Sequence, residues 1–234
     1  MKTMRILIIG SYKADALQSM IRFSELLPRF YCQYFSVSLV HIPSLFSCLP
    51  FLPAFVKKYF AYVDKLLLFP AYLLTRAHSF DFVHISDHGY SFYSFCFPRQ
   101  KSLVTCHDLL AMRAAFGDAS TACSTSLIGI WFQYLIKFGL QRAGAVVCDS
   151  HATFLDYQRL IGRPLRQRQA VIPIPLNASF KPDVNAFHLT QAEEDQIPEG
   201  CFLLMVGSSH PRKNRFLALQ LLDFYGADCP YQVV

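Results

Sequence analysis

Three stretches of the sequence place histidine and aspartate directly after an apolar run: "FDFVHISDHGYS", "SLVTCHDLLAMR" and "AVVCDSHAT". They contribute Asp87 and His88, His107 and Asp108, and Ser150. If the apolar runs are neighbouring strands of one parallel sheet, their carboxyl ends meet at one edge and these side chains line one cleft. An adjacent His107–Asp108 pair directly after a buried strand is costly unless it faces a site. The pattern therefore predicts a site that binds or transforms a polar substrate.

A structural role is the alternative for part of this set. His84 is expected to be a half-buried strand residue, while Asp149 and Ser150 could cap the following helix. A metal site would use the same residue types, but their spacing matches no zinc pattern, and we expect no metal. A Cys106–His107 nucleophile pair is disfavoured because adjacent strand residues point to opposite faces.

A second candidate site is the stretch "LLMVGSSHPRKN". An apolar run ends at Gly207, a turn begins at Ser208, and Arg212 and Lys213 stand before an amphipathic stretch. The N-terminus of a helix attracts anions through free N–H groups and its dipole, and adjacent cations add charge-assisted bonds. The spacing is not that of a Walker loop. We predict an anion-binding turn, with a solvated basic turn as the alternative.

These residues require a framework of strands and helices. Short apolar runs predict six buried strands: Arg5–Gly10, Tyr34–Val40, Phe80–Ser86, Ser102–Cys106, Ala145–Cys148 and Ala170–Ile174. Helices are predicted at Asp15–Leu27, Ser124–Arg142 and Ala152–Ile161. The second of these has an apolar face with spacings of three and four, made by Leu127, Trp131, Tyr134, Leu135 and Phe138. The alternation indicates an α/β fold with a mostly parallel sheet.

The domain organisation follows from a change of composition. Residues 1–176 form the predicted N-terminal domain, residues 177–200 a polar, proline-punctuated linker, and residues 201–234 the beginning of a second domain. That last piece reads as strand Cys201–Gly207, helix Asn214–Tyr225 and a strand at Tyr231–Val234. A strand–helix–strand unit of this size cannot bury both faces of its sheet, so we expect the second domain to be incomplete.

Composition restricts the partners. The net charge is +6 and the pI about 8.9, which suits phosphate-bearing ligands or an anionic membrane surface. No concentrated basic stripe predicts nucleic-acid binding. The eight cysteines form no CxxC pair, which favours a reducing cytoplasm. The segment Phe30–Val56 carries no formal charge, but Pro43, Pro50 and Pro53 interrupt it. We expect a broken apolar surface that could face a membrane rather than a spanning helix.

Taken in order, five stretches resemble the retaining, nucleotide-sugar-dependent glycosyltransferases of family four, which have the GT-B fold. They are "FDFVHISDHGYS", "SLVTCHDLLAMR", "AVVCDSHATFLDYQRLIG", "AVIPIPLNASFKP" and "LLMVGSSHPRKN", and they span roughly residues 80 to 225. The resemblance implies two facing Rossmann-like domains, the first binding the acceptor and the second the sugar nucleotide. It also implies transfer of a hexosyl unit to a hydroxyl of a glycan or glycolipid, with retained configuration.

The resemblance assigns roles to the rim residues. His107 is similar to the active-site histidine close to the transferred sugar, and Asp108 would support its loop. Ser150 resembles a serine beside the cleft, which Asp87 and His88 would also line.

The same resemblance assigns roles to residues of the predicted anion-binding turn. Lys213 and Arg212 would hold the donor diphosphate, and Gly207 and Ser208 would form the turn. Diphosphate departure would be stabilised electrostatically, without metal, cofactor or enzyme nucleophile.

Two departures from the family pattern matter. The loop "GSYKADAL" lacks the glycine pair that many members have there, and the E-x7-E element that reads the donor is not found in the sequence. We therefore expect a chain with little activity alone: a fragment, a split gene product whose second domain a separate chain would complete, or the product of a decayed gene. The enzyme would act in the cytoplasm, at the membrane face, in polysaccharide or glycolipid synthesis. The alternatives are a non-catalytic remnant or partner subunit, and an unrelated Rossmann-type enzyme, which the missing G-x-G-x-x-G disfavours.

Overall fold

The computed structural model describes residues 3–15, 17–46, 49, 53–121, 125–175, 201–205, 213–226 and 232–233. The chain divides into two compact units. The first comprises Met1–Asp118 and Ser124–Asn177, and the second Ala119–Cys123 and Ala178–Val234. Each unit has its own parallel sheet.

The first unit is built on a six-stranded sheet of order β2-β1-β3-β4-β5-β6, parallel throughout. Its strands are β1 (Arg5–Gly10), β2 (Ser36–His41), β3 (Phe82–Ile85), β4 (Ser102–Cys106), β5 (Ala145–Cys148) and β6 (Arg168–Val171). The bounds of β1, β4 and β5 are as predicted, β2 and β3 differ by one or two residues at their ends, and β6 shares only Ala170 and Val171 with the predicted run. The α/β class with a parallel sheet is therefore confirmed, because strands covered on both faces carry near-continuous apolar runs.

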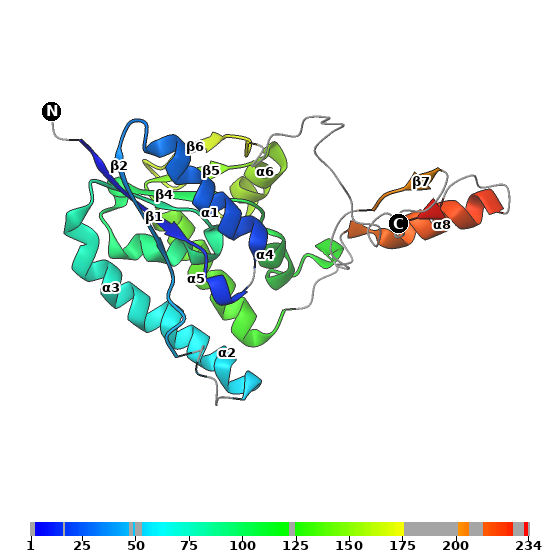
Figure 1. Cartoon of the computed structure of the whole chain (residues 1–234), viewed down its shortest axis with the longest axis horizontal. Helices are drawn as coiled ribbons and strands as arrows, with labels where there is room; N and C mark the ends of the chain where they lie inside the picture. Colours follow the sequence, from blue (N-terminus) through cyan, green and yellow to red (C-terminus); the bar gives the residue numbers. More distant parts are fainter. Residues whose placement is uncertain are drawn as a thin grey trace, which may run out of the picture. The chain divides into compact units, whose positions relative to one another are not determined.

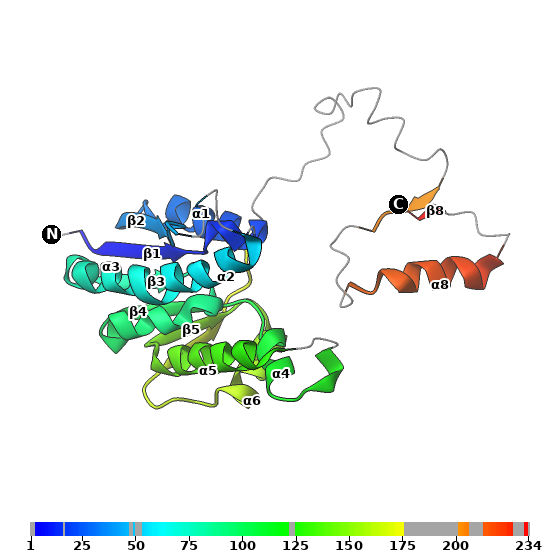
Figure 2. The same ribbon diagram turned by 90° about the horizontal axis from the view of Figure 1, so that it is seen from below.

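Helices cover both faces of this sheet. They are α1 (Gln18–Tyr31), α2 (Ala54–Val63), the π-helix η2 (Asp64–Leu68), α3 (Phe69–Arg76), α4 (Leu110–Ala115), α5 (Leu127–Arg142) and α6 (His151–Leu160). Shorter 3-10 segments of this unit are η1 (Lys13–Asp15), η3 (Ala77–Ser79), η4 (His88–Cys96) and η5 (Arg99–Lys101), whereas η6 (Ala119–Thr121) belongs to the second unit. Figures 1 and 2 show α1 on one face of the sheet and α3 and α5 on the other. Right-handed crossover connections produce this separation when strands are added first on one side of β1 and then on the other.

The buried face of α5 differs from the predicted one. Leu127 and Trp131 have exposed fractions of 85% and 58%, and Tyr134 and Phe138 are also exposed. The buried residues of the helix are Ile136, Gly139 and Leu140. Apart from the stripe of Gln133, Lys137 and Gln141, apolar residues occupy most of the helix surface, so its periodicity did not identify the core face.

Close packing of α5 against η4 decides which face is buried. A Cβ on Gly139 would lie 2.3 Å from the backbone nitrogen of Phe92. The hydroxyls of Ser91 and Ser94 donate to the carbonyl oxygens of Ile136 (2.7 Å) and Gly139 (2.9 Å). These contacts fix η4, whose first residue is His88. The position of the rim after β3 therefore depends on α5.

The second unit consists of β7 (Phe202–Leu203), α8 (Arg215–Tyr225) and β8 (Gln232–Val233). The two strands pair in parallel, as the strand–helix–strand prediction requires. Both residues of β7 are 39% exposed, and Ala218 is the buried residue of α8. The described residues of this unit thus leave most of their apolar side chains exposed.

No helix within the described parts of the chain is long and apolar enough to cross a membrane. The predicted apolar segment Phe30–Val56 instead begins near the end of α1, runs through β2 and reaches the first turn of α2.

Candidate functional site

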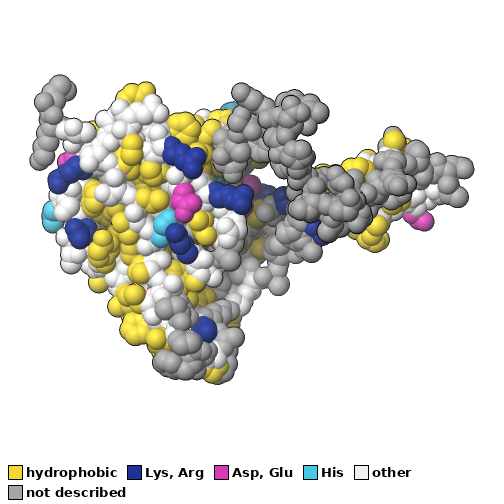
Figure 3. Space-filling view, in the orientation of Figure 1, with side chains coloured by type: hydrophobic (Ala, Val, Ile, Leu, Met, Phe, Trp, Pro, Cys, Tyr) yellow, Lys and Arg dark blue, Asp and Glu magenta, His cyan; other side chains and the backbone are white. Residues whose placement is uncertain are grey.

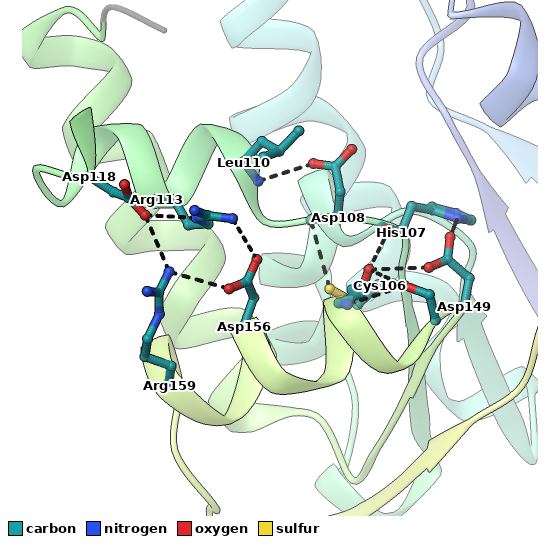
Figure 4. Close-up of polar contacts among 11 residues, drawn as sticks. Cys106, His107, Asp108, Leu110, Arg113, Asp118, Asp149, Asp156 and Arg159 are labelled. Carbon is teal, nitrogen blue, oxygen red and sulfur yellow. Dashed lines mark hydrogen bonds and ion pairs between the residues drawn. The ribbon is translucent and has the colours of Figure 1, made fainter. Parts of the chain in front are cut away.

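His107 follows β4 directly and is held by hydrogen bonds at both ring nitrogens. Its Nε2 lies 2.9 Å from the carbonyl oxygen of Ser86, and its Nδ1 lies 3.3 Å from Oδ2 of Asp149. Only 7% of its side chain is exposed, and Phe23 of α1 packs edge-on against the ring. A carbonyl and a carboxylate are both hydrogen-bond acceptors, and the tautomer of the ring decides which of them takes its N–H. Figure 4 shows the His107–Asp149 pair.

The first turn of α6 fixes Asp149 and the backbone of His107. Ser150 is the N-cap residue, and its Oγ accepts a hydrogen bond from the backbone nitrogen of Thr153 at 3.1 Å. The hydroxyl of Thr153 is 2.9 Å from the carbonyl oxygen of His107 and 3.3 Å from Oδ1 of Asp149. Ser150 thus has the predicted capping function, because a serine at this position satisfies a free helix N–H group.

Asp87 and His88 lie beside this pair, at the end of β3. Asp87 is 7% exposed, and it accepts hydrogen bonds from the backbone nitrogen of Gly89 (2.8 Å) and the hydroxyl of Ser11 (3.3 Å). The rings of His88 and His107 are 6.5 Å apart. Burial lowers the pKa of His88, although Asp87 acts to raise it. Nδ1 of His88 has no hydrogen-bond partner among the described residues, so this ring is less constrained than that of His107.

Asp108 points away from the pair. It is exposed, and its Oδ1 accepts a hydrogen bond from the backbone nitrogen of Leu110 at 3.2 Å, which supports the loop before α4. Beyond it, Arg113 joins Asp118 and Asp156 in a network of ion pairs (Figure 4). The structure therefore brings His107 together with Asp149, and Asp108 with the backbone of its own loop.

His84 is an interior residue, as the structural alternative predicted. It is 3% exposed, and its ring nitrogens lie 2.8 Å from Oγ1 of Thr105 and 3.1 Å from the hydroxyl of Tyr31. Burial, with a smaller contribution from His107, lowers the pKa of His84 to about 3. It is therefore neutral at physiological pH and serves packing.

Sequence reasoning missed a polar cluster at the end of β1. The Nζ atom of Lys65 lies 2.6 Å from Oδ2 of Asp15, and the hydroxyl of Tyr90 donates to the same oxygen at 2.9 Å. The hydroxyl of Tyr12 donates to buried Asp64 at 3.1 Å. Lys65 and Asp64 come from the π-helix η2, a rare element that often occurs at functional sites. Its only sequence signal is a charged pair inside an apolar run.

The predicted anion-binding turn is described only at its end. Gly207, Ser208 and Arg212 lie outside the described residues. Lys213 is exposed and directly precedes Asn214, the N-cap residue of α8. Among the described residues, no three His, Cys, Asp or Glu side chains are grouped to hold a metal ion.

No protein-family model and no curated protein matches the sequence. Among solved structures, the chain is similar to UGT2 of Phytolacca americana in complex with UDP-2-fluoro-glucose and pterostilbene. The identity is 10%, over 89% of this chain and 60% of that chain, with a TM-score of 0.47. It is also similar to a UDP-glucosyltransferase of Polygonum tinctorium that can glucosylate indoxyl, with 11% identity, the same coverages and a TM-score of 0.43. The chain thus spans about 60% of the length of these structures.

Proposed function

We propose that the chain is part of a retaining, nucleotide-sugar-dependent glycosyltransferase similar to family four, with a GT-B fold. It would move a hexosyl unit to a hydroxyl of a glycan or glycolipid. The observation that carries the proposal is the His107–Asp149 pair beside Asp87 and His88, at the carboxyl ends of adjacent parallel strands. Ligands of open α/β sheets bind at this edge. The order of the five sequence stretches supports the same function.

The rim residues suit different parts of this reaction. The ring of His107 is held in place by the carbonyl oxygen of Ser86 and the carboxylate of Asp149. A polar group fixed in this way can act on the transferred sugar without first reorganising. His88 has a lowered pKa and stays neutral at physiological pH, so it can accept a hydrogen bond from an acceptor hydroxyl.

The second unit would contribute the donor diphosphate contacts. Lys213, with Arg212, Gly207 and Ser208, would hold the phosphates at the start of α8, and the nucleotide sugar is a substrate rather than a cofactor. We expect Lys213→Ala to weaken binding of a nucleoside diphosphate at least tenfold, measured by calorimetry on the 234-residue chain. Lys137→Ala, which removes a cation of the first unit, is the control. Equal affinity in the wild type and Lys213→Ala would mean that this lysine only faces solvent.

The rate of glycosyl transfer tests the proposed role of His107. We expect the chain alone to turn over nucleotide sugars slowly, because we propose that further donor-binding structure completes the second domain. His107→Ala should abolish the transfer that is measurable, followed as release of nucleoside diphosphate in the presence of a glycolipid extract. Rapid turnover by the purified chain would contradict the need for a completing segment. Nucleotide-sugar binding without any transfer, even beside a completing chain, would favour a non-catalytic partner subunit.

A membrane surface is the proposed location of the acceptor. An apolar groove of about 550 Å³ is lined by Tyr62, Val63, Leu66, Leu67, Phe92, Phe95, Trp131 and Leu135. Figure 3 shows hydrophobic side chains over α2 and α3. The segments around the groove (α2, η2, α3 and α5) carry lysine and arginine, and their one carboxylate, Asp64, is buried. Apolar and cationic side chains without exposed carboxylates suit an anionic lipid surface.

Vesicle sedimentation tests this location. Trp131→Ser and Leu67→Ser should each reduce binding of the chain to vesicles that contain an anionic lipid. Leu155→Ser removes an equally exposed leucine from α6, outside the groove, and should leave binding unchanged. Equal loss in all three variants would show that the groove is not the contact surface.

A further inference from the structure

A second pocket opens at the opposite edge of the sheet, where the strands begin. Its volume is about 560 Å³, within the usual range of small-molecule sites. It is lined by the first residues of β3 and β5, by the η5 turn before β4, and by the segment that enters β6. Three arginines contribute to the lining, Arg99, Arg166 and Arg168, and no lining residue that the structure describes is acidic. The pocket therefore concentrates positive charge away from the His107 rim.

Arg99 has unused hydrogen-bonding capacity. Its Nε and Nη2 atoms are buried and have no hydrogen-bond partner in the described structure. These two atoms form one edge of the guanidinium fork, which matches two oxygens of a phosphate or carboxylate. Buried donors without partners are rare and call for an explanation, and a bound anion would satisfy both atoms.

The backbone at Arg99 is fixed in place. Its carbonyl oxygen accepts a hydrogen bond from the hydroxyl of Ser102 at 2.9 Å. A Cβ on Gly144 would lie 2.1 Å from the same oxygen, so only glycine lets β5 begin this close to the turn. The guanidinium therefore starts from a rigid point on the pocket wall.

Arg166 supports the same interpretation from another element. It has φ 61°, in the left-handed region, although it is neither glycine nor asparagine. Backbone strain of this kind often occurs at ligand-binding positions. The strained residue contributes a cation to the pocket that Arg99 lines.

We propose that this pocket binds a small molecule through a dianionic phosphate group, held by Arg99, Arg166 and Arg168. Three guanidinium groups without a neighbouring carboxylate match a dianion better than a single carboxylate. The phosphate belongs either to a free phosphorylated compound or to a lipid headgroup, because the pocket lining recognises the same group in both. This site is independent of the proposed glycosyl transfer.

Calorimetry of the full chain with inorganic phosphate at about 0.15 M KCl, where weak surface attraction is screened, tests the proposal. We expect saturable binding that Arg99→Ala and Arg168→Ala each weaken at least tenfold. Arg163→Ala, which replaces an exposed arginine outside the pocket, should change the affinity less than twofold.

Arg166→Gly separates binding from folding. Glycine relieves the left-handed strain, so the melting temperature without phosphate should rise while phosphate binding weakens. Sedimentation with phosphatidylcholine vesicles, with and without phosphatidic acid, identifies the source of the phosphate. Retention that requires phosphatidic acid and Arg168 would assign the site to a lipid headgroup. No binding to phosphate or to these vesicles, or equal loss in Arg163→Ala, would overturn the proposal.

Discussion

The contact between α5 and η4 gives a sharp prediction for Gly139→Ala. The added Cβ would lie 2.3 Å from the backbone nitrogen of Phe92 and 2.4 Å from the carbonyl carbon of Ser91. Backbone atoms cannot rotate aside as a flexible side chain can, so the helix and η4 must move apart. Such a movement also lengthens the hydrogen bonds that the hydroxyls of Ser91 and Ser94 donate to α5.

Opposing effects determine the magnitude. Alanine is favoured over glycine inside a helix by about 1 kcal/mol. Overpacking a buried contact costs about 1–3 kcal/mol, and each weakened hydrogen bond about 1 kcal/mol. The net expectation is a loss of about 2–4 kcal/mol in the free energy of unfolding. Gly129→Ala is the matched control in the same helix, because its Cβ would meet the side-chain methyl of Thr125, and it should be neutral or stabilising.

Urea unfolding followed by tryptophan fluorescence measures the difference. The chain has one tryptophan, Trp131, and it lies in α5, so the signal reports on the first unit. With a slope of about 2 kcal/mol per M, the midpoint of Gly139→Ala should fall by about 1–2 M. Because η4 begins at His88, nucleotide-sugar transfer should also fall. A midpoint equal to that of Gly129→Ala would refute the close packing of these two segments.

Three further predictions concern single side chains. The pKa of His84 falls from 6.5 to about 3 in the folded chain, so stability is complete above pH 6.5 and is lost as pH falls toward 3. Between pH 7 and 5 this group alone costs about 2 kcal/mol, and His84→Gln should remove that part of the pH dependence in urea titrations. Lys65→Met should destabilise the chain by about 2 kcal/mol, because it removes the cation that pairs with the Asp15 carboxylate. Adding Asp15→Asn should restore part of this stability, measured by thermal unfolding. Ser150→Ala should cost about 1 kcal/mol in urea unfolding through the lost cap of α6, and no loss would contradict its capping role.

The sequence determined the sheet and its polar edge. Near-continuous apolar runs are typical of strands buried on both faces, and their ends predicted that His107, Asp87 and Ser150 follow adjacent strands. The helix cap at Ser150 could also be predicted from the sequence, because a serine directly before an amphipathic stretch satisfies a free helix N–H group. These features depend on residues close together in the chain, so local patterns contain them.

The tertiary structure decided what distant segments do to one another. The sequence indicated that Asp149 could cap a helix, but it did not predict the hydrogen bond between Asp149 and His107, which lies 42 positions earlier. The core face of α5 depends on Gly139 meeting η4, because apolar residues occupy most of the helix surface and do not single out one face. The pocket around Arg99 combines residues from separate elements whose meeting point follows only from strand order. Local periodicity specifies the elements, and contacts between elements specify the sites.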